Sequence, residues 1–184
     1  MFSSNGQILF SDVNLSNSTK YSNIVLPNCF VGSTQFISSL GVITLRKGYE
    51  FTQQHKKFDV PTSDGDWSLA TVKKFGVQRI FKIVLERSTY FCTSSHRWLI
   101  STRRGLKSIP TVELKHYMKI PYRMCNTESY THIIHIEDTG RYEGVYCVVE
   151  PRTKSFTLSG GELTGNCETD LLEFQNLPVF MYNV

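Results

Sequence analysis

Short runs of alternating apolar and polar residues dominate the middle of the chain. They read SLATVKKFG, QRIFKIVLE, STYFCTS, HRWLIST, THIIHIED, GVYCVVEP and KSFTLS, and they are rich in β-branched and aromatic residues. Turn-forming residues separate them at 62–66, 103–105, 138–140 and 159–161. This rhythm predicts an all-β domain built of many short strands. Only residues 111–116 (TVELKH) predict a helical turn.

The size of the chain allows one hydrophobic core. It has 184 residues, of which 40% are hydrophobic, and this is too few for two independent cores. The sequence contains no run of about 18 apolar residues, the length that could span a bilayer. The first 20 residues lack the basic start and the apolar centre of a secretory signal. We therefore expect a single monomeric domain, soluble and cytoplasmic, without membrane contact.

The charge pattern argues against nucleic-acid binding. The formal net charge is only +4, and the basic pairs are scattered without interleaved aromatic residues. The five cysteines are odd in number and form no CxxC pair, which argues against a disulfide framework and against a dedicated zinc site. The cysteines are therefore candidates for free, reactive thiols.

The two ends of the chain differ from its middle. Residues 1–28 are rich in Ser and Asn, and residues 168–184 lack the rhythm of strands and turns. Composition alone leaves two interpretations open: flanks that come from another protein, or two disordered termini.

Six residues that can carry chemistry stand within or at the ends of the β-rich segment. Each has a plain structural explanation, because a lone cysteine is usually a buried apolar residue and a threonine, histidine or asparagine near a turn usually stabilises that turn. In chain order, however, they supply the groups needed to cut two peptide bonds and to join the outer pieces. They are Cys29, Thr93, His96, Cys147, Asn166 and Cys167.

The first step would convert a peptide bond into a thioester. The thiol of Cys29 can attack the carbonyl of Asn28. A histidine titrates near neutral pH, so His96 can protonate the leaving nitrogen, while the hydroxyl of Thr93 can hold the carbonyl oxygen.

The later steps would use the residues at the other end of the segment. Cys167 would take the acyl group by thiol–thioester exchange. The carboxamide of Asn166 would then attack its own backbone carbonyl, and the resulting succinimide would release the middle of the chain.

These residues and the segments around them resemble an intein, a self-splicing domain whose Hint fold is shared with hedgehog autoprocessing domains. The resemblance rests on CFVGSTQFI, on KKFGVQRIFKIVLERSTYFCTSSHRWLI with its Thr-x-x-His, and on GVYCVVEPRTKSFTLSGGELTGNC. It covers residues 29–166 and implies a mini-intein without an endonuclease, folded as a flattened horseshoe of two pseudo-two-fold related β halves. Residues 1–28 and 167–184 would then be extein flanks, the intramolecular substrate, and no cofactor would be needed.

The same resemblance implies a role for each residue. Cys29, Asn166 and Cys167 would be the splicing residues, and Thr93 and His96 would activate the first step. Each molecule would act once on itself, so the domain would not be a turnover enzyme.

Three positions depart from the intein pattern and leave open which group assists asparagine cyclisation. Gly165 replaces the usual histidine before Asn166, Cys147 replaces an aspartate, and Lys154-Ser155 replace a second histidine and its neighbour. Cys147 is the first candidate for a substitute, as a thiol acid or hydrogen-bond donor. Lys154 is the second, as a donor to the carbonyl of Asn166.

Two histidines of one predicted strand, His132 and His135, are weaker alternatives, because alternation turns only one face inward. Gly165 suggests a different effect, since a residue without Cβ gives the backbone at Asn166 more freedom to reach an attack angle. We expect cyclisation to be slower than in a histidine-bearing relative, because a proton donor is missing.

The thiols also suggest regulation. If they converge on one centre, Cys29, Cys147 and Cys167, together with His96, can bind zinc or form a disulfide that blocks splicing.

Two other functions fit parts of the pattern. A cleavage-only Hint domain would lose the first thioester to water or another nucleophile, although such a domain does not need the cysteine after Asn166. A non-catalytic β-barrel binding module would use the same side chains for structure alone.

Overall fold

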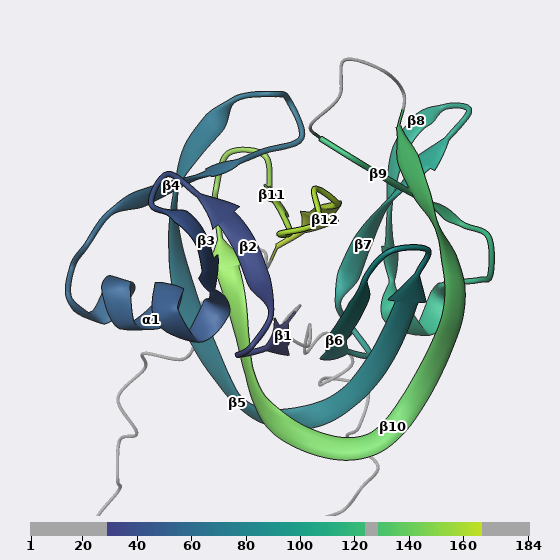
Figure 1. Ribbon diagram of the computed structural model, residues 1–184, viewed down its shortest axis with the longest axis horizontal. Coiled ribbons are helices and arrows are strands. Elements are labelled where there is room, and N and C mark those ends of the chain that lie inside the picture. The colour runs from purple at the N-terminus through teal and green to yellow at the C-terminus, as the bar shows by residue number, and fades with distance from the viewer. Residues whose placement is uncertain (1–28, 124–128, 167–184) are drawn as a thin grey trace, which may run out of the picture.

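The computed structural model describes residues 29–123 and 129–166, and strands make up most of them (Figure 1). The all-β prediction is confirmed, as is the helical turn at 111–116, which contains a short 3-10 helix. The predicted flanks, residues 1–28 and 167–184, lie outside the described residues. In chain order the elements are β1 (Phe30–Val31), β2 (Gln35–Ser38), β3 (Gly41–Thr44), α1 (Leu45–Gln53), β4 (Phe58–Pro61), β5 (Trp67–Leu85), β6 (Thr89–Thr93), β7 (Arg97–Thr102), β8 (Gly105–Pro110), η2 (Thr111–Glu113), β9 (Lys119–Pro121), β10 (Tyr130–Val149), β11 (Ser155–Thr157) and β12 (Leu163–Gly165).

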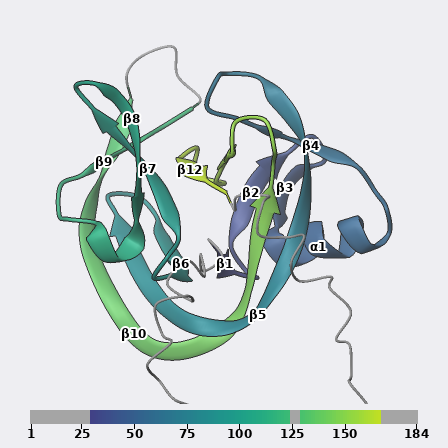
Figure 2. The same cartoon turned by 180° about the vertical axis from the view of Figure 1, so that it is seen from behind.

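Two long strands give the molecule its shape. β5 and β10 pair antiparallel along most of their length, and the ribbon that they form curves beneath the two lobes of a horseshoe (Figures 1 and 2). The alternation pattern predicts two separate runs in each of these strands, and that prediction is wrong. Each strand continues through irregular pairing, which bends the ribbon without interrupting it.

The turn predicted at 138–140 is one such irregularity. The register between β5 and β10 shifts between Asp138 and Tyr142. Here Gly140 has a φ of 67°, and its N–H donates to Asp138 Oδ1 over 3.0 Å. Turn-forming residues therefore build a bulge inside β10 instead of reversing the chain. The other predicted turns are confirmed, because each joins two strands: 62–66, 103–105 and 159–161.

β1 lies in the interior of the largest sheet. That sheet has the order β4-β5-β6-β1-β10-β9, and a second sheet has the order β11-β12-β7-β8. Phe30 of β1 pairs with Cys92 of β6 on one side and with Tyr146 of β10 on the other. β11 and β12 lie between the two lobes (Figures 1 and 2). Both ends of the described segment, Cys29 and Asn166, are therefore buried inside the fold.

The helix α1 was not predicted from the sequence. Thr44 begins it, because its hydroxyl accepts a hydrogen bond from the N–H of Lys47 over 3.2 Å. Gly48 lets the helix approach β5, since a Cβ there would lie 2.8 Å from Val72 Cγ2. The helix is short and has only a narrow apolar face, so periodicity alone could not reveal it. The N-cap threonine was the available signal.

An aromatic cluster packs around β1. The ring of Phe30 lies 5.6 Å from that of Trp98, 6.3 Å from that of Phe156 and 6.2 Å from that of Tyr90, all in edge-to-face arrangements. Such pairs contribute about 0.5–1.5 kcal/mol each beyond the area that they bury. Phe30 is fully buried, so this packing also fixes the position of Cys29, the residue before it.

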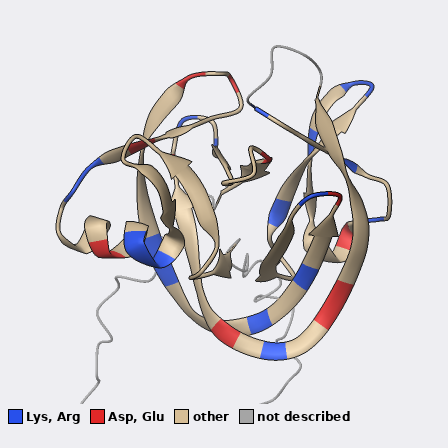
Figure 3. Cartoon of the chain, in the orientation of Figure 1, with Lys and Arg blue, Asp and Glu red and all other residues tan. Residues whose placement is uncertain are grey.

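Charged residues lie mainly along the β5–β10 ribbon, on α1 and at the loops (Figure 3). Ion pairs join β5 to β10 at Arg79–Asp138 and Lys82–Glu137, and their side chains are well exposed. Exposed ion pairs contribute little to stability, so backbone pairing is what holds the ribbon together. Within the described residues, the helices are all too short or too polar to cross a bilayer.

Candidate active site

Thr93 forms hydrogen bonds with both backbone polar groups of Cys29. The N–H of Cys29 donates to Thr93 Oγ1 over 3.3 Å, and the N–H of Thr93 donates to the Cys29 carbonyl over 2.9 Å. We expected the Thr93 hydroxyl to hold the carbonyl oxygen of Asn28, which lies outside the described residues. That expectation stays a prediction. Among the described residues, the Thr93 hydroxyl accepts from the N–H of Cys29, whose nitrogen would be the leaving group of the first step.

His96 lies on the turn that follows Thr93. The backbone N–H of His96 donates to the Thr93 carbonyl over 3.2 Å. The buried ring packs between Phe30, whose ring is tilted and 4.0 Å away, and Trp98, whose ring is edge-to-face and 5.1 Å away. Ring atom Nε2 lies 2.8 Å from Oγ1 of Thr164. The structure thus brings together Cys29, Thr93 and His96 as the sequence pattern predicts, although no pattern predicts Thr164.

Cys147 lies beside Cys29. Antiparallel pairing of β1 with β10 aligns Phe30 with Tyr146 and Val31 with Val145, so the next positions along, residues 29 and 147, lie side by side. Both cysteines belong to a separate apolar cluster that is completed by Val31, Ile80 and Val145. The sulfur of Cys147 also lies 3.1 Å from the Val148 carbonyl. Cys147 therefore lies next to the residue predicted to be the first nucleophile.

Not every buried cysteine is reactive. Burial raises the pKa of Cys92 to about 12, although hydrogen bonds from Thr111 and Trp98 act in the opposite direction. A thiol of this kind stays protonated at neutral pH and is a poor nucleophile. Cys92 is therefore a core residue and a useful control for the other thiols.

The turn at residues 150–154 holds Asn166 by two backbone carbonyls. Nδ2 of Asn166 donates to the Glu150 carbonyl over 2.7 Å, and its backbone N–H donates to the Lys154 carbonyl over 2.9 Å. Lys154 has a φ of 55°, a left-handed conformation that costs free energy for a residue with a Cβ. Its side chain is exposed, so the contact between Lys154 and Asn166 involves the backbone and not the predicted ammonium.

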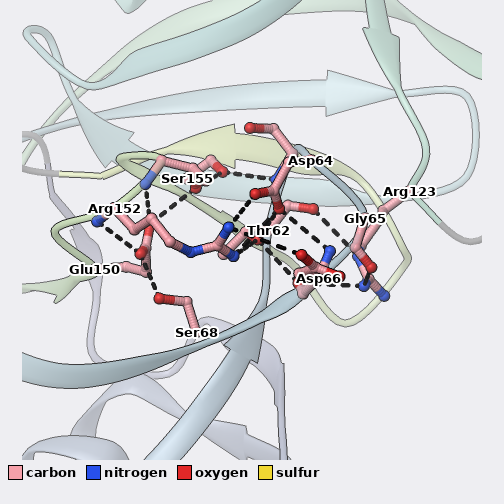
Figure 4. Close-up of polar contacts among 11 residues, drawn as sticks. Thr62, Asp64, Gly65, Asp66, Ser68, Arg123, Glu150, Arg152 and Ser155 are labelled. Carbon is pink, nitrogen blue, oxygen red and sulfur yellow. Dashed lines mark hydrogen bonds and ion pairs between the residues drawn. The ribbon is translucent and has the colours of Figure 1, made fainter.

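The carboxylate of Glu150 organises this turn (Figure 4). It is fully buried and accepts hydrogen bonds from Ser68 Oγ (2.6 Å), from the N–H of Arg152 (2.8 Å), and from both the N–H (2.9 Å) and the hydroxyl (2.8 Å) of Thr153. Burial raises the pKa of Glu150, but the hydrogen bonds from Ser68, Thr153 and Arg152 outweigh it and hold the pKa below its ordinary value. Glu150 therefore stabilises the turn in its ionised form.

Two arginines hold the neighbouring loop at 62–66: Arg152 of the same turn, and Arg123, which follows β9 (Figure 4). Arg152 forms an ion pair with Asp64 and donates to Thr62 Oγ1 over 3.1 Å. Arg123 donates to the Thr62 carbonyl over 3.2 Å and to the Gly65 carbonyl. A hydrogen bond from Thr62, assisted by Arg152, lowers the pKa of Asp64 to about 2. The loop at 62–66 thus closes over the turn that holds Asn166.

Gly165 is required by a close contact. A Cβ on this residue would lie 2.7 Å from the carbonyl oxygen of Arg97 on β7. Gly165 is absent from the glycines with positive φ, so the structure does not support our interpretation that this glycine supplies unusual backbone freedom. A side chain at this position, a histidine included, would collide with the backbone of β7.

The weaker histidine candidates have other partners. His132 Nδ1 lies 3.1 Å from Glu86 Oε1, and His135 lies 6.3 Å, ring to ring, from His116. For residues 29–123 and 129–166, no three His, Cys, Asp or Glu side chains are placed to share a metal ion. The hypothetical zinc site also needs Cys167, which lies outside the described residues.

Two site residues were missed, and the sequence offers little to find them. Thr164 contacts a residue 68 positions earlier, and nothing local distinguishes it from any other strand threonine. Glu150 precedes the sequence PRT at the end of a strand. A carboxylate just before a turn is a weak signal that it accepts hydrogen bonds from the N–H groups of that turn.

Comparison with solved structures identifies the fold. No protein-family model matches the sequence, and no curated protein matches it. The structure is similar to a DnaB intein from Synechocystis sp. PCC 6803, with a TM-score of 0.60 and 16% identity over 75% of this chain and 97% of that chain. It is also similar to the VidaL intein, with a TM-score of 0.62 and 12% identity over 77% and 99% of the two chains. A bacterial intein-like domain from Clostridium thermocellum gives a TM-score of 0.56 and 11% identity over 76% and 99%. The chain therefore has the Hint fold of inteins, as predicted.

Proposed function

We propose that residues 29–166 are a self-splicing intein domain that excises itself and joins residue 28 to residue 167. All steps take place within one molecule, so a monomer suffices and the flanks 1–28 and 167–184 are the substrate. The mechanism uses thiols and needs no metal, cofactor or nucleic acid. It suits the cytoplasm, where cysteines stay reduced.

The first step would be an N-to-S acyl shift. Sγ of Cys29 attacks the carbonyl carbon of Asn28, an S–C bond replaces the C–N bond, and the thiol proton ends on the nitrogen of Cys29 as an amine. His96 is suited to carry that proton, because its ring packs against Phe30, the residue after the nucleophile. The hydrogen bond from the Cys29 N–H to Thr93 fixes the leaving nitrogen beside it.

The remaining steps would move the acyl group and release the domain. The thiolate of Cys167 forms a new thioester as the thiol of Cys29 leaves. Nδ2 of Asn166 attacks its own carbonyl carbon, the bond to the nitrogen of Cys167 breaks, and the domain leaves with a C-terminal succinimide. The freed amine then displaces the sulfur of Cys167 and forms an amide with Asn28. The hydrogen bond from Nδ2 to the Glu150 carbonyl limits rotation of the carboxamide before attack.

The observation that carries the proposal is a short path of contacts between the two ends of the domain. Hydrogen bonds join Cys29 to Thr93, Thr93 to His96, and His96 to Thr164. Thr164 lies two residues before Asn166. Residues that are far apart in sequence and suited to successive steps thus share one buried region.

Intact-mass spectrometry of three variants beside the wild-type chain tests the proposal. Asn166→Ala should retain residues 167–184 but release residues 1–28 when a small thiol is added, because the thioester still forms. Cys29→Ala should retain residues 1–28 and release only the other flank. Cys92→Ala, which changes the unreactive buried thiol, should still yield both splicing products.

Other outcomes would contradict splicing in distinct ways. If the wild-type chain releases both flanks without joining them, the domain is a cleavage-only Hint domain. If the wild type and all variants stay intact under reducing conditions, the Hint fold serves here as a non-catalytic binding module.

A further inference from the structure

The hydrogen bond between Thr164 and His96 is unlike the usual bonding of a strand threonine. Both residues are fully buried, and Oγ1 lies 2.8 Å from Nε2. Thr157 on the adjacent strand β11 is equally buried, but its hydroxyl donates to a backbone carbonyl, that of Pro61, over 2.9 Å. Thr164 thus directs its hydroxyl to a histidine side chain that lies next to Cys29 and Phe30.

The position of Thr164 is tightly determined. β12 lies between β11 and β7 (Figure 1), and Thr164 pairs with Phe156 on one side and with Trp98 on the other. A β-strand held on both edges has little freedom to move its side chains. The hydroxyl is therefore a fixed point against which the imidazole ring can be oriented.

We propose that Thr164 is the positioning residue for His96: the C-terminal strand sets the ring orientation and tautomer that activate the bond before Cys29. This inference rests on the proposed splicing function. The partner of one ring nitrogen determines which nitrogen carries the proton in the neutral ring, so a partner at Nε2 also decides what the other nitrogen offers.

A hydroxyl group suits this role because it can both donate and accept. It donates to Nε2 when the ring is neutral and protonated at the other nitrogen, and it accepts from Nε2–H when the ring is an imidazolium. The same contact therefore persists while the ring gains and loses a proton. The neighbouring Trp98 is not a substitute, because its Nε1–H donates to Thr111 over 3.2 Å.

The contact also couples the two ends of the domain. β12 carries Thr164 to His96 and leads directly to Asn166, whose amide nitrogens bond to the turn at 150–154. When β12 docks, Thr164 therefore binds His96, the histidine of the first step, and Asn166, the asparagine of the last step, is brought to the turn that holds it. We therefore expect thioester formation to require a docked β12, although its chemistry takes place at the other end of the domain.

Thr164→Val removes the hydroxyl and keeps the shape, and Thr164→Ser restores the hydroxyl. Both are placed in an Asn166→Ala chain, where the rate at which a small thiol releases residues 1–28 reports thioester formation alone. We expect Thr164→Val to slow release about tenfold, the change that loss of one buried hydrogen bond predicts. Thr164→Ser should recover most of the rate. Thr157→Val is the matched control, because it removes a buried hydroxyl without touching His96.

A second readout does not depend on activity. In a full-length Cys29→Ala, Asn166→Ala chain, which cannot react, the ring ¹⁵N and ¹³C chemical shifts of His96 report its tautomer. They should change in Thr164→Val, return in Thr164→Ser and stay unchanged in Thr157→Val. If Thr164→Val does not fold, Thr164→Ala takes its place, and Thr164→Ser must then exceed it in rate.

The outcomes separate this inference from the splicing proposal. Parental cleavage rates with unchanged ring shifts in Thr164→Val would overturn the positioning role. Equal slowing by Thr164→Val and Thr157→Val, without a change of tautomer, would also overturn it, because the threonine would then be purely structural. If the Asn166→Ala parent forms no thioester, splicing itself fails, while the ring shifts still test the contact.

Discussion

Gly165 lies where the backbones of β12 and β7 approach each other closely. Because it has no Cβ, there is room for the Arg97 carbonyl, and β12 can pack against β7, where Thr164 pairs with Trp98. The absence of a histidine before Asn166 is therefore tied to the packing of the strand. The backbone carbonyls of the 150–154 turn orient the asparagine instead.

This packing predicts that placing a histidine before Asn166 slows C-terminal cleavage. Gly165→His and Gly165→Ala should both slow release of residues 167–184 in a Cys29→Ala chain by about tenfold or more, because the added Cβ displaces β12. A denaturing gel over time measures that release. Gly144→Ala is the control, since a Cβ there would lie 3.9 Å from its nearest neighbour, the Gly76 oxygen. Faster release in Gly165→His would show that a missing proton donor, and not space, limits cyclisation.

The turn between β10 and β11 works as a unit. The Glu150 side chain binds the N–H groups of residues 152 and 153, which leaves the carbonyls of residues 150 and 154 directed at Asn166. A change in the Glu150 carboxylate should therefore alter both the free energy of unfolding and the geometry of Asn166.

Glu150→Gln tests the unit, because an amide NH₂ cannot accept the bonds that one carboxylate oxygen accepts. We expect the free energy of unfolding at pH 7 to fall by about 2 kcal/mol. The pKa of Glu150 is lowered from its ordinary 4.5 in the folded chain, so the carboxylate stabilises the fold above about that pH and loses its effect as the pH falls through the folded pKa. The difference between variant and wild type should shrink accordingly in acid.

Urea unfolding at several pH values measures this difference. Glu137→Gln, which alters an exposed ion pair with Lys82, should leave the free energy of unfolding almost unchanged at every pH. Equal stability of Glu150→Gln and wild type at pH 7 would mean that the carboxylate does not hold the turn.

Across the whole molecule, the curved β5–β10 ribbon brings distant segments together. It joins the two lobes, and β1 and β12 lie within the space that it encloses (Figures 1 and 2). The first and last residues of the described segment consequently share a buried region with Thr93 and His96. The topology of the strands, more than any single side chain, brings Cys29 and the strand that leads to Asn166 into one buried region.

The sequence revealed local features and missed long-range ones. Alternation located most strands, and the order of Cys29, Thr93, His96 and Asn166 indicated the candidate site. It failed where one signal has two meanings: Asp138 to Gly140 could form either a turn or a bulge, and only pairing with β5 decides for the bulge. Thr164 could not be found, because its partner is specified by the tertiary fold.

The most direct measurement is tandem mass spectrometry of the peptides that the wild-type chain produces in the presence of a reductant. Splicing predicts a peptide in which Asn28 is followed by Cys167, together with a released segment 29–166 that is one water lighter than its free acid because it ends in a succinimide. A chain that remains whole after prolonged incubation, with Asn28 still bonded to Cys29 and Asn166 to Cys167, would contradict self-splicing.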